Sequence, residues 1–266
     1  DLAALGAEMV AGDLTDPTSL QRACRGATRV LACAHGMLGR GRWRSQAVDD
    51  AGHRALLAAA RAAGVERFVY TSGMGVHDGH PIDFFRTKAA IEGAVRDSGM
   101  AFAILRPSAF MEHHVHEFNG KAVLAKGKAQ LIGPGTKPRN FVAGSDVAQF
   151  AVRALLDEPL PFTSLDIGGH DHFSGLDIAR LYAQAAGIEP RVSHLPAGVA
   201  ALLSVLARPL HPGLARVMRL MSLPDDAFDE RFDGAAALEA RFGLRLKRVP
   251  EFVREQVALA GRTPAH

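Results

Sequence analysis

The sequence predicts an α/β fold in which a doubly wound parallel sheet is followed by a smaller, mainly helical C-terminal lobe. Up to about residue 168, short apolar runs alternate with segments of helical periodicity, the order expected of a parallel sheet with helices on both faces. From residue 169 onward the pattern is mostly helical and interrupted by prolines. We therefore expect a sheet domain over residues 1–168 and a helical lobe over residues 169–266.

Strands are expected where a short apolar run ends in small or turn-forming residues. Each pair of neighbouring runs leaves room for a helix between them. Right-handed crossovers then bring the C-terminal ends of the strands to one edge of the sheet, where such folds bind ligands. The expected strands are "EMVAG" (8–12), "RVLACA" (29–34), "RFVYTS" (67–72), "FAILRP" (102–107) and "SLDIG" (164–168).

The segments between these strands have the features of helices. Asp16-Pro17 begins the first, because proline suits the first helical turn. Residues 44–63 place apolar side chains about every 3.6 residues, beginning at Val48. Beyond the last strand, Ser174 and Asp177 form a capping box that opens another helix.

The composition is that of an ordinary globular protein. The 266 residues are 48% hydrophobic and 22% charged, with a formal net charge of +3 and scattered basic residues, so neither a nucleic-acid nor a membrane-surface footprint is indicated. Cys24 and Cys33 fit small core residues in a reducing compartment. The longest apolar run, residues 195–207, is too short to span a bilayer, and no signal peptide is visible. These features predict a cytoplasmic protein and leave its oligomeric state open.

Several strand ends carry residues that could contact a ligand. Asp13 could accept hydrogen bonds from an adenine or a ribose hydroxyl, or could be a turn residue at a helix entry. The small residues of "ACAHG" (32–36) allow either close approach of a flat ligand or a tight turn. In "YTSGMG" (70–75), Thr71 and Ser72 supply hydroxyls at the end of a central strand.

The stretch "LRPSAFMEHHVHE" (105–117) could suggest a metal site. Glu112 and His116 are four residues apart, as are His113 and Glu117, so each pair could share a helix face. Neither pair reproduces a two-histidine spacing such as H-E-x-x-H, and no third ligand is evident. We expect no metal and interpret the stretch as a polar pocket wall.

Lys88 is a lone cation on an apolar helix face. It lies four residues after Phe84 and shares that face with Ile91 and Val95. Two interpretations are open: a site that lacks its acid, or a lysine whose stem crosses the core and whose charge reaches water.

Taken in order, these segments resemble an atypical short-chain dehydrogenase/reductase of the NmrA-like, NAD(P)-binding group. The resemblance covers most of residues 5–187. The matching segments are "LGAEMVAGDLTDPTSLQRACRGATRVLA", "VDDAGHRALLAAARAAGVERFVYTSGMGV", "FFRTKAAIEGAVRDSGMAFAILRPSAFME", "NFVAGSDVAQFAVRALL" and "LDIGGHDHFSGLDIARLYAQAAG".

The resemblance implies a Rossmann-like fold with a glycine-rich pyrophosphate loop on its first strand and helix. No such loop follows a first strand here, and the unit would lie before Asp1. We therefore expect an N-terminally truncated sheet in which "EMVAG" is detached from "RVLACA", because the strands between them in the order 3-2-1-4-5-6 are absent.

The resemblance also assigns roles at the site. Lys88 matches the family's lysine, Phe84 takes the place of its tyrosine, and Gly73 that of its serine or threonine, with Ser72 adjacent. Lys88 and Ser72 are thus the implied catalytic residues, with Lys88 mainly an anchor for the nicotinamide ribose. Residues 111–140 and the lobe would form the substrate side, including Met111, His113 and His114. The implied cofactor-binding residues are Asp13, Leu14, Cys33, Ala34, His35, Gly36, Thr71, Ser72, Lys88, Pro107, Ser108, Ala109 and Phe110.

Two functions follow from the resemblance. The first is an oxidoreductase that uses NAD(P)H, by family more often NADP than NAD, to reduce a small carbonyl, enone or quinone. Its proton would come from Lys88, from His113 or His114, or from water. The second is a non-catalytic NAD(P)-sensing regulator or assembly factor, which the missing tyrosine favours.

Overall fold

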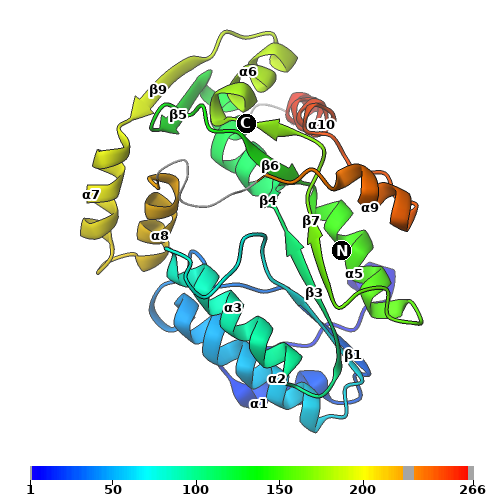
Figure 1. Cartoon of the computed structure of the whole chain (residues 1–266). Helices are drawn as coiled ribbons and strands as arrows, with labels where there is room; N and C mark the ends of the chain where they lie inside the picture. The colour runs from blue at the N-terminus through cyan, green and yellow to red at the C-terminus, as the bar shows by residue number, and fades with distance from the viewer. Residues whose placement is uncertain (1, 224–230, 263–266) are drawn as a thin grey trace.

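A four-stranded parallel sheet forms the centre of the molecule. The computed structural model describes residues 2–223 and 231–262 (Figure 1). The strand order is β1-β2-β3-β7. These strands are β1 (Arg29–Ala32), β2 (Arg67–Thr71), β3 (Ala101–Pro107) and β7 (Ser164–Ile167). Four of the expected strands and their parallel arrangement are confirmed.

The fifth expected strand, "EMVAG", is not a strand. Residues 7–13 belong to no ladder, and Met9 and Val10 are 68% and 52% exposed. Within the described residues β1 pairs only with β2, so the 7–13 segment has no neighbouring strand to supply hydrogen bonds. An apolar pattern cannot form an isolated strand, because both the backbone ladder and the buried face require a partner.

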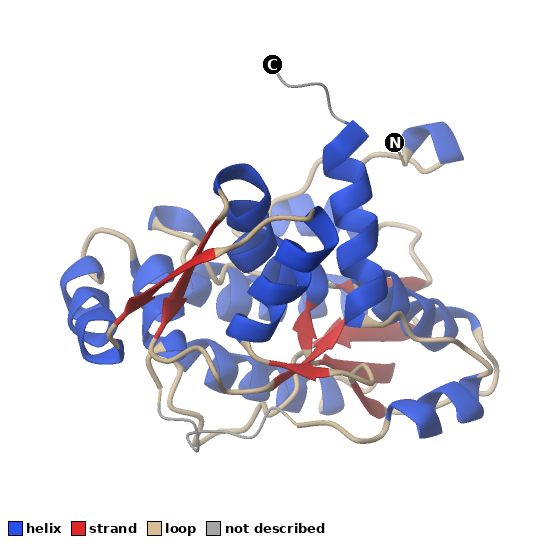
Figure 2. Ribbon diagram, turned by 90° about the horizontal axis from the view of Figure 1, so that it is seen from above, coloured by secondary structure: helices blue, strands red, loops and turns tan. Residues whose placement is uncertain are grey.

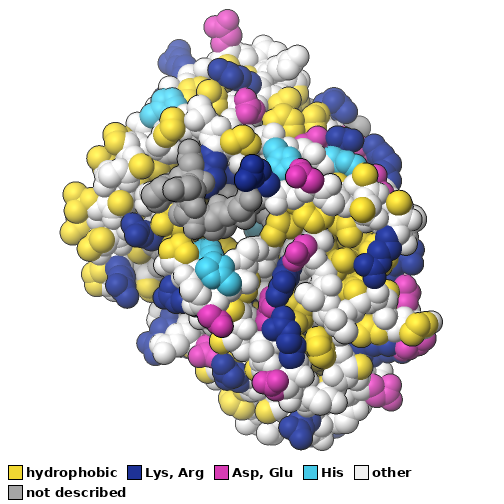
Figure 3. All heavy atoms as spheres, in the orientation of Figure 1, with side chains coloured by type: hydrophobic (Ala, Val, Ile, Leu, Met, Phe, Trp, Pro, Cys, Tyr) yellow, Lys and Arg dark blue, Asp and Glu magenta, His cyan; other side chains and the backbone are white. Residues whose placement is uncertain are grey.

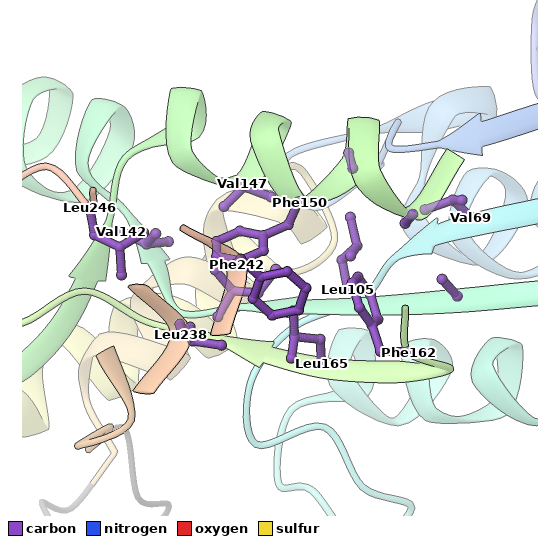
Figure 4. Close-up of a cluster of buried hydrophobic side chains, with 14 of the residues drawn as sticks. Val69, Leu105, Val142, Val147, Phe150, Phe162, Leu165, Leu238, Phe242 and Leu246 are labelled. Carbon is purple, nitrogen blue, oxygen red and sulfur yellow. The ribbon is translucent and has the colours of Figure 1, made fainter. Parts of the chain in front are cut away.

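Helices cover both faces of the sheet, which confirms the doubly wound arrangement. One face packs on α1 (Pro17–Cys24), α2 (His53–Ala62) and α3 (Asp83–Arg96), around Phe68 and Tyr70. The other packs on α5 (Gly144–Leu156) and α9 (Ala235–Phe242). On that face Phe150 meets Phe242 edge to face, beside Leu105 and Leu165 of the strands (Figure 4).

Local sequence signals explain where the helices begin. Asp16 accepts a hydrogen bond from the Thr18 N–H at 3.0 Å, with Pro17 in the first turn of α1. The expected capping box of Ser174 and Asp177 is present at the start of α6 (Gly175–Ala186). The helix expected over residues 44–63 begins instead with the wide π-type turns of η3 (Gln46–Gly52) before α2. Short 3₁₀ turns occur at η1 (Ala3–Leu5) and η2 (Gly41–Trp43).

Two small sheets and several helices complete the structure. The chain leaves β3 through β4 (Ala109–Phe110), a π-type helix η4 (Met111–Gly120) and α4 (Lys121–Lys126). β4 pairs with β6 (Arg139–Val142), and β6 with β8 (His172–Phe173). β5 (Lys128–Ile132) pairs in parallel with β9 (Arg191–Leu195), to the left of the main sheet in Figure 2.

The C-terminal part is mainly helical, as expected. It contains α7 (Ala197–Ala207), α8 (Pro212–Met221) and α10 (Val249–Arg262), in addition to α6 and α9. α6, α10 and η4 share a second core around Tyr182. No helix in the described ranges is both long enough and apolar enough to cross a membrane.

One expectation about the core is wrong. Cys24 is buried as expected, but Cys33 is exposed, because it lies beyond the end of β1 at the sheet edge.

A buried ion pair fastens α3 to the sheet. Glu92 is 2% exposed and accepts hydrogen bonds from Arg106 of β3, at 2.9 Å to its Nε, and from Arg96 at 2.8 Å. Burial alone would raise the pKa of Glu92. The hydrogen bonds and charge of Arg106, together with the nearby Ser72 hydroxyl and Arg96, outweigh burial, so the pKa of Glu92 lies below its ordinary value.

We predict that Glu92→Gln lowers the free energy of unfolding by about 2–3 kcal/mol, because it leaves two guanidinium groups without their buried counter-ion. The pKa of Glu92 is lowered on folding, so its contribution is present above the ordinary value of 4.5 and is lost as the pH falls below it. Urea denaturation of both proteins measures the difference. Glu117→Gln, which removes an exposed pair with Lys121, is the control and should cost much less stability than Glu92→Gln. Equal losses in the two variants would contradict the prediction.

Candidate functional site

The C-terminal ends of β1, β2 and β3 meet at one edge of the sheet. Because the three strands are parallel and in register, residues 33–36, 71–75 and 107–110 lie side by side there. The Met74 N–H donates to the Pro107 carbonyl at 2.9 Å, which ties two of the loops together. The sequence-predicted residues from the three strand ends therefore share one edge.

Lys88 ends under this edge and does not reach water. The side chain is buried, at 6% exposure, and Nζ donates to the Thr71 carbonyl at 2.9 Å and approaches the Tyr70 hydroxyl at 3.5 Å. Burial lowers the pKa of Lys88 to about 8, although the carboxylates of Asp49 and Glu92 act in the opposite direction. The lysine is thus held at the end of β2, where it exchanges a proton close to neutral pH.

Phe84 lies one helical turn before Lys88 and offers it only a ring face. Its centroid is 5.3 Å from the lysine Nζ, and the ring is buried against Ile82 and Leu220. His35 approaches the same ring edge-on, at 6.1 Å between centroids. No hydroxyl is present at this position to relay a proton.

Asp49 is a site residue that the sequence interpretation missed. It lies in η3, is 1% exposed, and accepts a hydrogen bond from the Gly36 N–H at 2.9 Å. Its charge acts on Lys88 and His35, so it lies close to both. A signal was available: Asp49 and His53 are four residues apart on a helix whose other periodic positions are apolar. Charged residues are seldom placed on such a face without a partner.

Ser72 and Ser108, at the ends of β2 and β3, have different surroundings. Ser72 faces Glu92 and helps to lower the pKa of that carboxyl, although its Oγ makes no hydrogen bond of ordinary geometry among the described residues. Ser108 Oγ is buried at the end of β3 and also has no partner in the described part of the chain. A buried hydroxyl without a partner at a sheet edge is suited to a ligand oxygen.

Asp13 is engaged by the protein itself. Its carboxylate accepts hydrogen bonds from the Thr15 N–H and hydroxyl, both at 2.8 Å. The same carboxylate forms an ion pair with Arg42 at 3.2 Å. The backbone bond from Thr15 is the main reason that the pKa of Asp13 is lowered. Leu14 packs against Gly52, where a Cβ would lie 2.9 Å from it. The turn role expected for Asp13 is thus present, and its ligand role stays a prediction.

Residues 33–36 give an open wall to the edge. Cys33, Ala34 and His35 are exposed, whereas Gly36 is buried where a Cβ would meet Val48 at 3.0 Å. The surrounding protein lowers the pKa of His35, and the positive charge of Lys88 lowers it further. The neutral form of His35 is consequently favoured, although the Asp49 charge acts in the opposite direction.

The three residues expected on the substrate side, Met111, His113 and His114, lie in different surroundings. Met111 is fully buried in the second core, and His113 is exposed. His114 lines a cavity of about 290 Å³ between β5, α6 and α8, with its Nδ1 3.5 Å from Arg139 Nη1. Burial and the Arg139 charge hold the pKa of His114 well below its ordinary value.

Glu112 and Glu117 of the same stretch bind groups of the protein itself. Glu112 accepts the Gly144 N–H at 3.0 Å, and Glu117 pairs with Lys121 at 3.0 Å. His116 lies 3.0 Å from the Tyr182 hydroxyl. These partners point in different directions, and no group of three metal-ligating side chains occurs within residues 2–223 and 231–262.

The remaining cofactor candidates, Pro107, Ala109 and Phe110, lie where β3 passes into β4. The Ser108 N–H donates to the Ile167 carbonyl at 2.8 Å, which fixes this crossover at the sheet edge. Lys88, Thr71 and Ser108 thus supply a cation, a hydroxyl and an unpartnered hydroxyl at adjacent strand ends. That set fits the ribose and amide of a bound dinucleotide better than it fits a metal.

Comparison with known proteins agrees with this geometry. A family model described as NAD(P)H-binding matches residues 1–158. An NADPH-dependent quinone oxidoreductase, QOR2 of Escherichia coli, complexed with NADPH, has the same fold with a TM-score of 0.73 at 23% identity. The match covers 96% of this chain and 85% of that one.

Curated relatives fall into two kinds. An NAD(P)H azoreductase of Xenophilus azovorans is 28% identical over 188 residues, which cover 70% of this chain and 61% of the relative. A photosystem II assembly factor, Ycf39 of Guillardia theta, is 24% identical over 193 residues, which cover 72% of this chain and 60% of the relative. The chain thus spans about 60% of the length of these relatives.

The buried position of Lys88 predicts a specific pH dependence of stability. Its pKa falls from 10.5 to about 8 on folding, so the unfolded chain binds more protons between these values and stability rises with pH across them. The free energy of unfolding of the wild type should therefore gain on the order of 2–3 kcal/mol relative to Lys88→Met over this interval. Urea denaturation below pH 8 and near pH 10.5 checks this, with Lys121→Met as the exposed-lysine control. A constant difference between wild type and Lys88→Met would show that Lys88 is not desolvated.

Proposed function

Because the chain belongs to the NAD(P)H-binding family, in the NmrA-like class of atypical short-chain dehydrogenases/reductases, we propose that it reduces a small carbonyl, enone or quinone with NADPH. When bound, the nicotinamide supplies the hydride. The protein's own residues have to position the reactants, exclude water and provide the proton. The azoreductase and the NADPH-complexed quinone oxidoreductase favour a reductase, and the second of them favours NADPH over NADH.

The observation that carries the proposal is the burial of Lys88 at the end of β2. A buried lysine is costly to stability unless its charge is used, and structural needs here are already met by Glu92 and Arg106. Nζ donates one proton to the Thr71 carbonyl at 2.9 Å and directs a second toward the Tyr70 hydroxyl at 3.5 Å, so one proton remains to reach a ribose hydroxyl at the sheet edge. Thr71 and Ser108 would contact the amide side, while Asp13 and Leu14 border the adenine.

Proton supply is the step in which this site differs from its family. Phe84 has no proton to give, so the donor is Lys88 itself, an exposed histidine such as His113, or water. The pKa of Lys88, about 8, suits proton donation near neutral pH. His114 stays neutral because of its lowered pKa, so it serves better as a hydrogen-bonding group than as an acid.

The cavity beside the sheet edge favours a flat, mainly apolar substrate. It is bounded by Leu131, Ile178 and Leu220, and its polar wall includes His114 and Arg139. Such a lining suits an aromatic or quinonoid ring whose oxygen meets the polar wall. In this proposal residues 111–140 and the part of the chain after residue 169 form the substrate side, and residues 1–168 hold the cofactor.

A second candidate is a non-catalytic NAD(P)-sensing assembly or regulatory factor. The specific observation in its favour is the pair of departures at the site, Phe84 without a hydroxyl and Ser72 turned toward Glu92. The similarity to an assembly factor is the companion observation. Both candidates require dinucleotide binding, so they differ only in turnover.

We predict that Lys88→Met weakens NADPH binding about ten- to a hundredfold, because one charged hydrogen-bond donor to the ribose is lost, which is equivalent to about 1.5–3 kcal/mol. Calorimetric titration of NADPH measures both affinities. Lys121→Met, an exposed lysine on η4–α4, should leave the affinity unchanged. Equal affinities for wild type and Lys88→Met would refute the anchoring role.

Turnover separates the two candidates. The reductase proposal expects NADPH consumption, followed by absorbance, with members of a panel of quinones, enones and aldehydes. Phe84→Tyr should raise the rate with aldehydes about tenfold or more, because it restores a general acid one turn from Lys88. NADPH binding without consumption by either protein would favour the sensing factor.

A further inference from the structure

Helix α7 presents an apolar surface to the outside of the molecule. It contains no charged residue between Ala197 and Ala207, and its length is too short to span a membrane. Only its Ala200 and Ser204 are buried, against α8. Its large side chains are 38–67% exposed: Val199, Leu202, Leu203, Val205 and Leu206.

A second segment extends this surface. Gly213 at the start of α8 packs so closely on the loop after β1 that a Cβ would lie 2.4 Å from Leu38. Leu210, at 81% exposure, shares a shallow hollow with Trp43, which is 52% exposed. We call α7 together with Leu38, Trp43 and Leu210 the apolar face. In Figure 3 hydrophobic side chains gather at the left margin, over α7, with Lys and Arg side chains beside them.

Among the described residues, the charges around the apolar face are mainly positive, and the acidic side chain at its border, Asp13 beside Trp43, is already paired with Arg42. Neither residues 36–48 nor residues 190–222 contain an aspartate or glutamate. Arg40 and Arg44 are exposed on the loop, Arg208 is exposed at the end of α7, and none of the three has an ion pair among the residues that the structure describes. Arginines that are scattered in the sequence thus converge on one rim.

An apolar face with an arginine rim could meet a second copy of the chain or a lipid surface, and its charges favour the lipid. If the face met a second copy of itself about a twofold axis, Arg40, Arg44 and Arg208 would oppose arginines with no acidic residue from either segment to pair with them. An anionic lipid surface offers the complementary arrangement, phosphates for the rim and acyl chains for the leucines. Tryptophan and arginine are also the side chains that suit the boundary between headgroups and hydrocarbon.

We propose that the apolar face docks peripherally on an anionic lipid surface, with α7 and Leu210 entering the headgroup boundary and the arginine rim contacting phosphates. The docking helix α7 packs on α8, and Val217 and Leu220 of α8 line the cavity. The proposal does not depend on which dinucleotide or acceptor the protein uses.

Flotation of the protein with vesicles tests the docking directly. Vesicles of phosphatidylglycerol and phosphatidylcholine in equal amounts should carry the protein upward, and vesicles of phosphatidylcholine alone should carry much less. Added salt should weaken binding to the anionic vesicles, because it screens the arginine rim. No flotation with anionic vesicles above the vesicle-free control would overturn the proposal without any variant being made.

Variants then locate the contact. Leu202→Asp combined with Leu206→Asp should reduce vesicle binding at least about tenfold, because two charges oppose entry into the apolar boundary. The double variant Arg40→Gln with Arg44→Gln should weaken vesicle binding about fivefold for each arginine removed, equivalent to about 1 kcal/mol each. Leu156→Asp on α5 and Leu259→Asp on α10 are controls, since these leucines are 58% and 56% exposed elsewhere on the surface.

The outcome is decided by comparison with the controls. Loss confined to the α7 and arginine variants, with unchanged circular dichroism, supports the docking. Equal loss in the control variants, or binding that the α7 variant retains, overturns it. Sedimentation velocity covers the remaining case: self-association that Leu202→Asp with Leu206→Asp abolishes, in a protein that ignores anionic vesicles, would assign the face to a second copy.

Discussion

The contact of helix α3 with the ends of β2 and β3 determines the geometry of the site. Lys88 and Glu92 lie on one face of this helix, four residues apart, and both are buried. Glu92 is fixed by Arg106 of β3, and Lys88 by the Thr71 carbonyl of β2. Opposite charges that are buried on one face can be satisfied in only one register, so the helix cannot slide along the sheet without exposing one of them to apolar surroundings. The position of Lys88 at the sheet edge follows from this register.

The same burial gives Lys88 its chemistry. Taking the ammonium out of water lowers its pKa, and the nearby carboxylates of Asp49 and Glu92 limit the effect. Asp49 is itself held by the Gly36 backbone at the end of β1. Three strand ends, one helix and one π-type turn therefore set the protonation of a single side chain. The costly burial of this cation persists although Phe84, one helical turn away, offers no proton.

Sequence reasoning succeeded where local pattern and tertiary structure agree. Four strands follow from short apolar runs, because each of these runs also finds a partner in the sheet. The start of α6 follows from the Ser174–Asp177 capping box, which depends on nearby residues alone. "EMVAG" failed because a strand also needs a neighbour, which no local pattern reveals. Asp49 was missed because its importance comes from Lys88, which is distant in sequence. The β5–β9 pairing, between segments about sixty residues apart, was invisible for the same reason.

Helix α7 connects the interior of the protein with its surface. At 1.5 Å per residue its eleven residues form a rod about 16 Å long. Its first residue, Ala197, lines the cavity, and Leu206 near its other end is 61% exposed. A rigid rod transmits a tilt at one end to the other. If α7 tilts as a unit, a load on the leucines would also move Ala197 at the cavity wall, and a molecule in the cavity would in turn change the angle of the leucines.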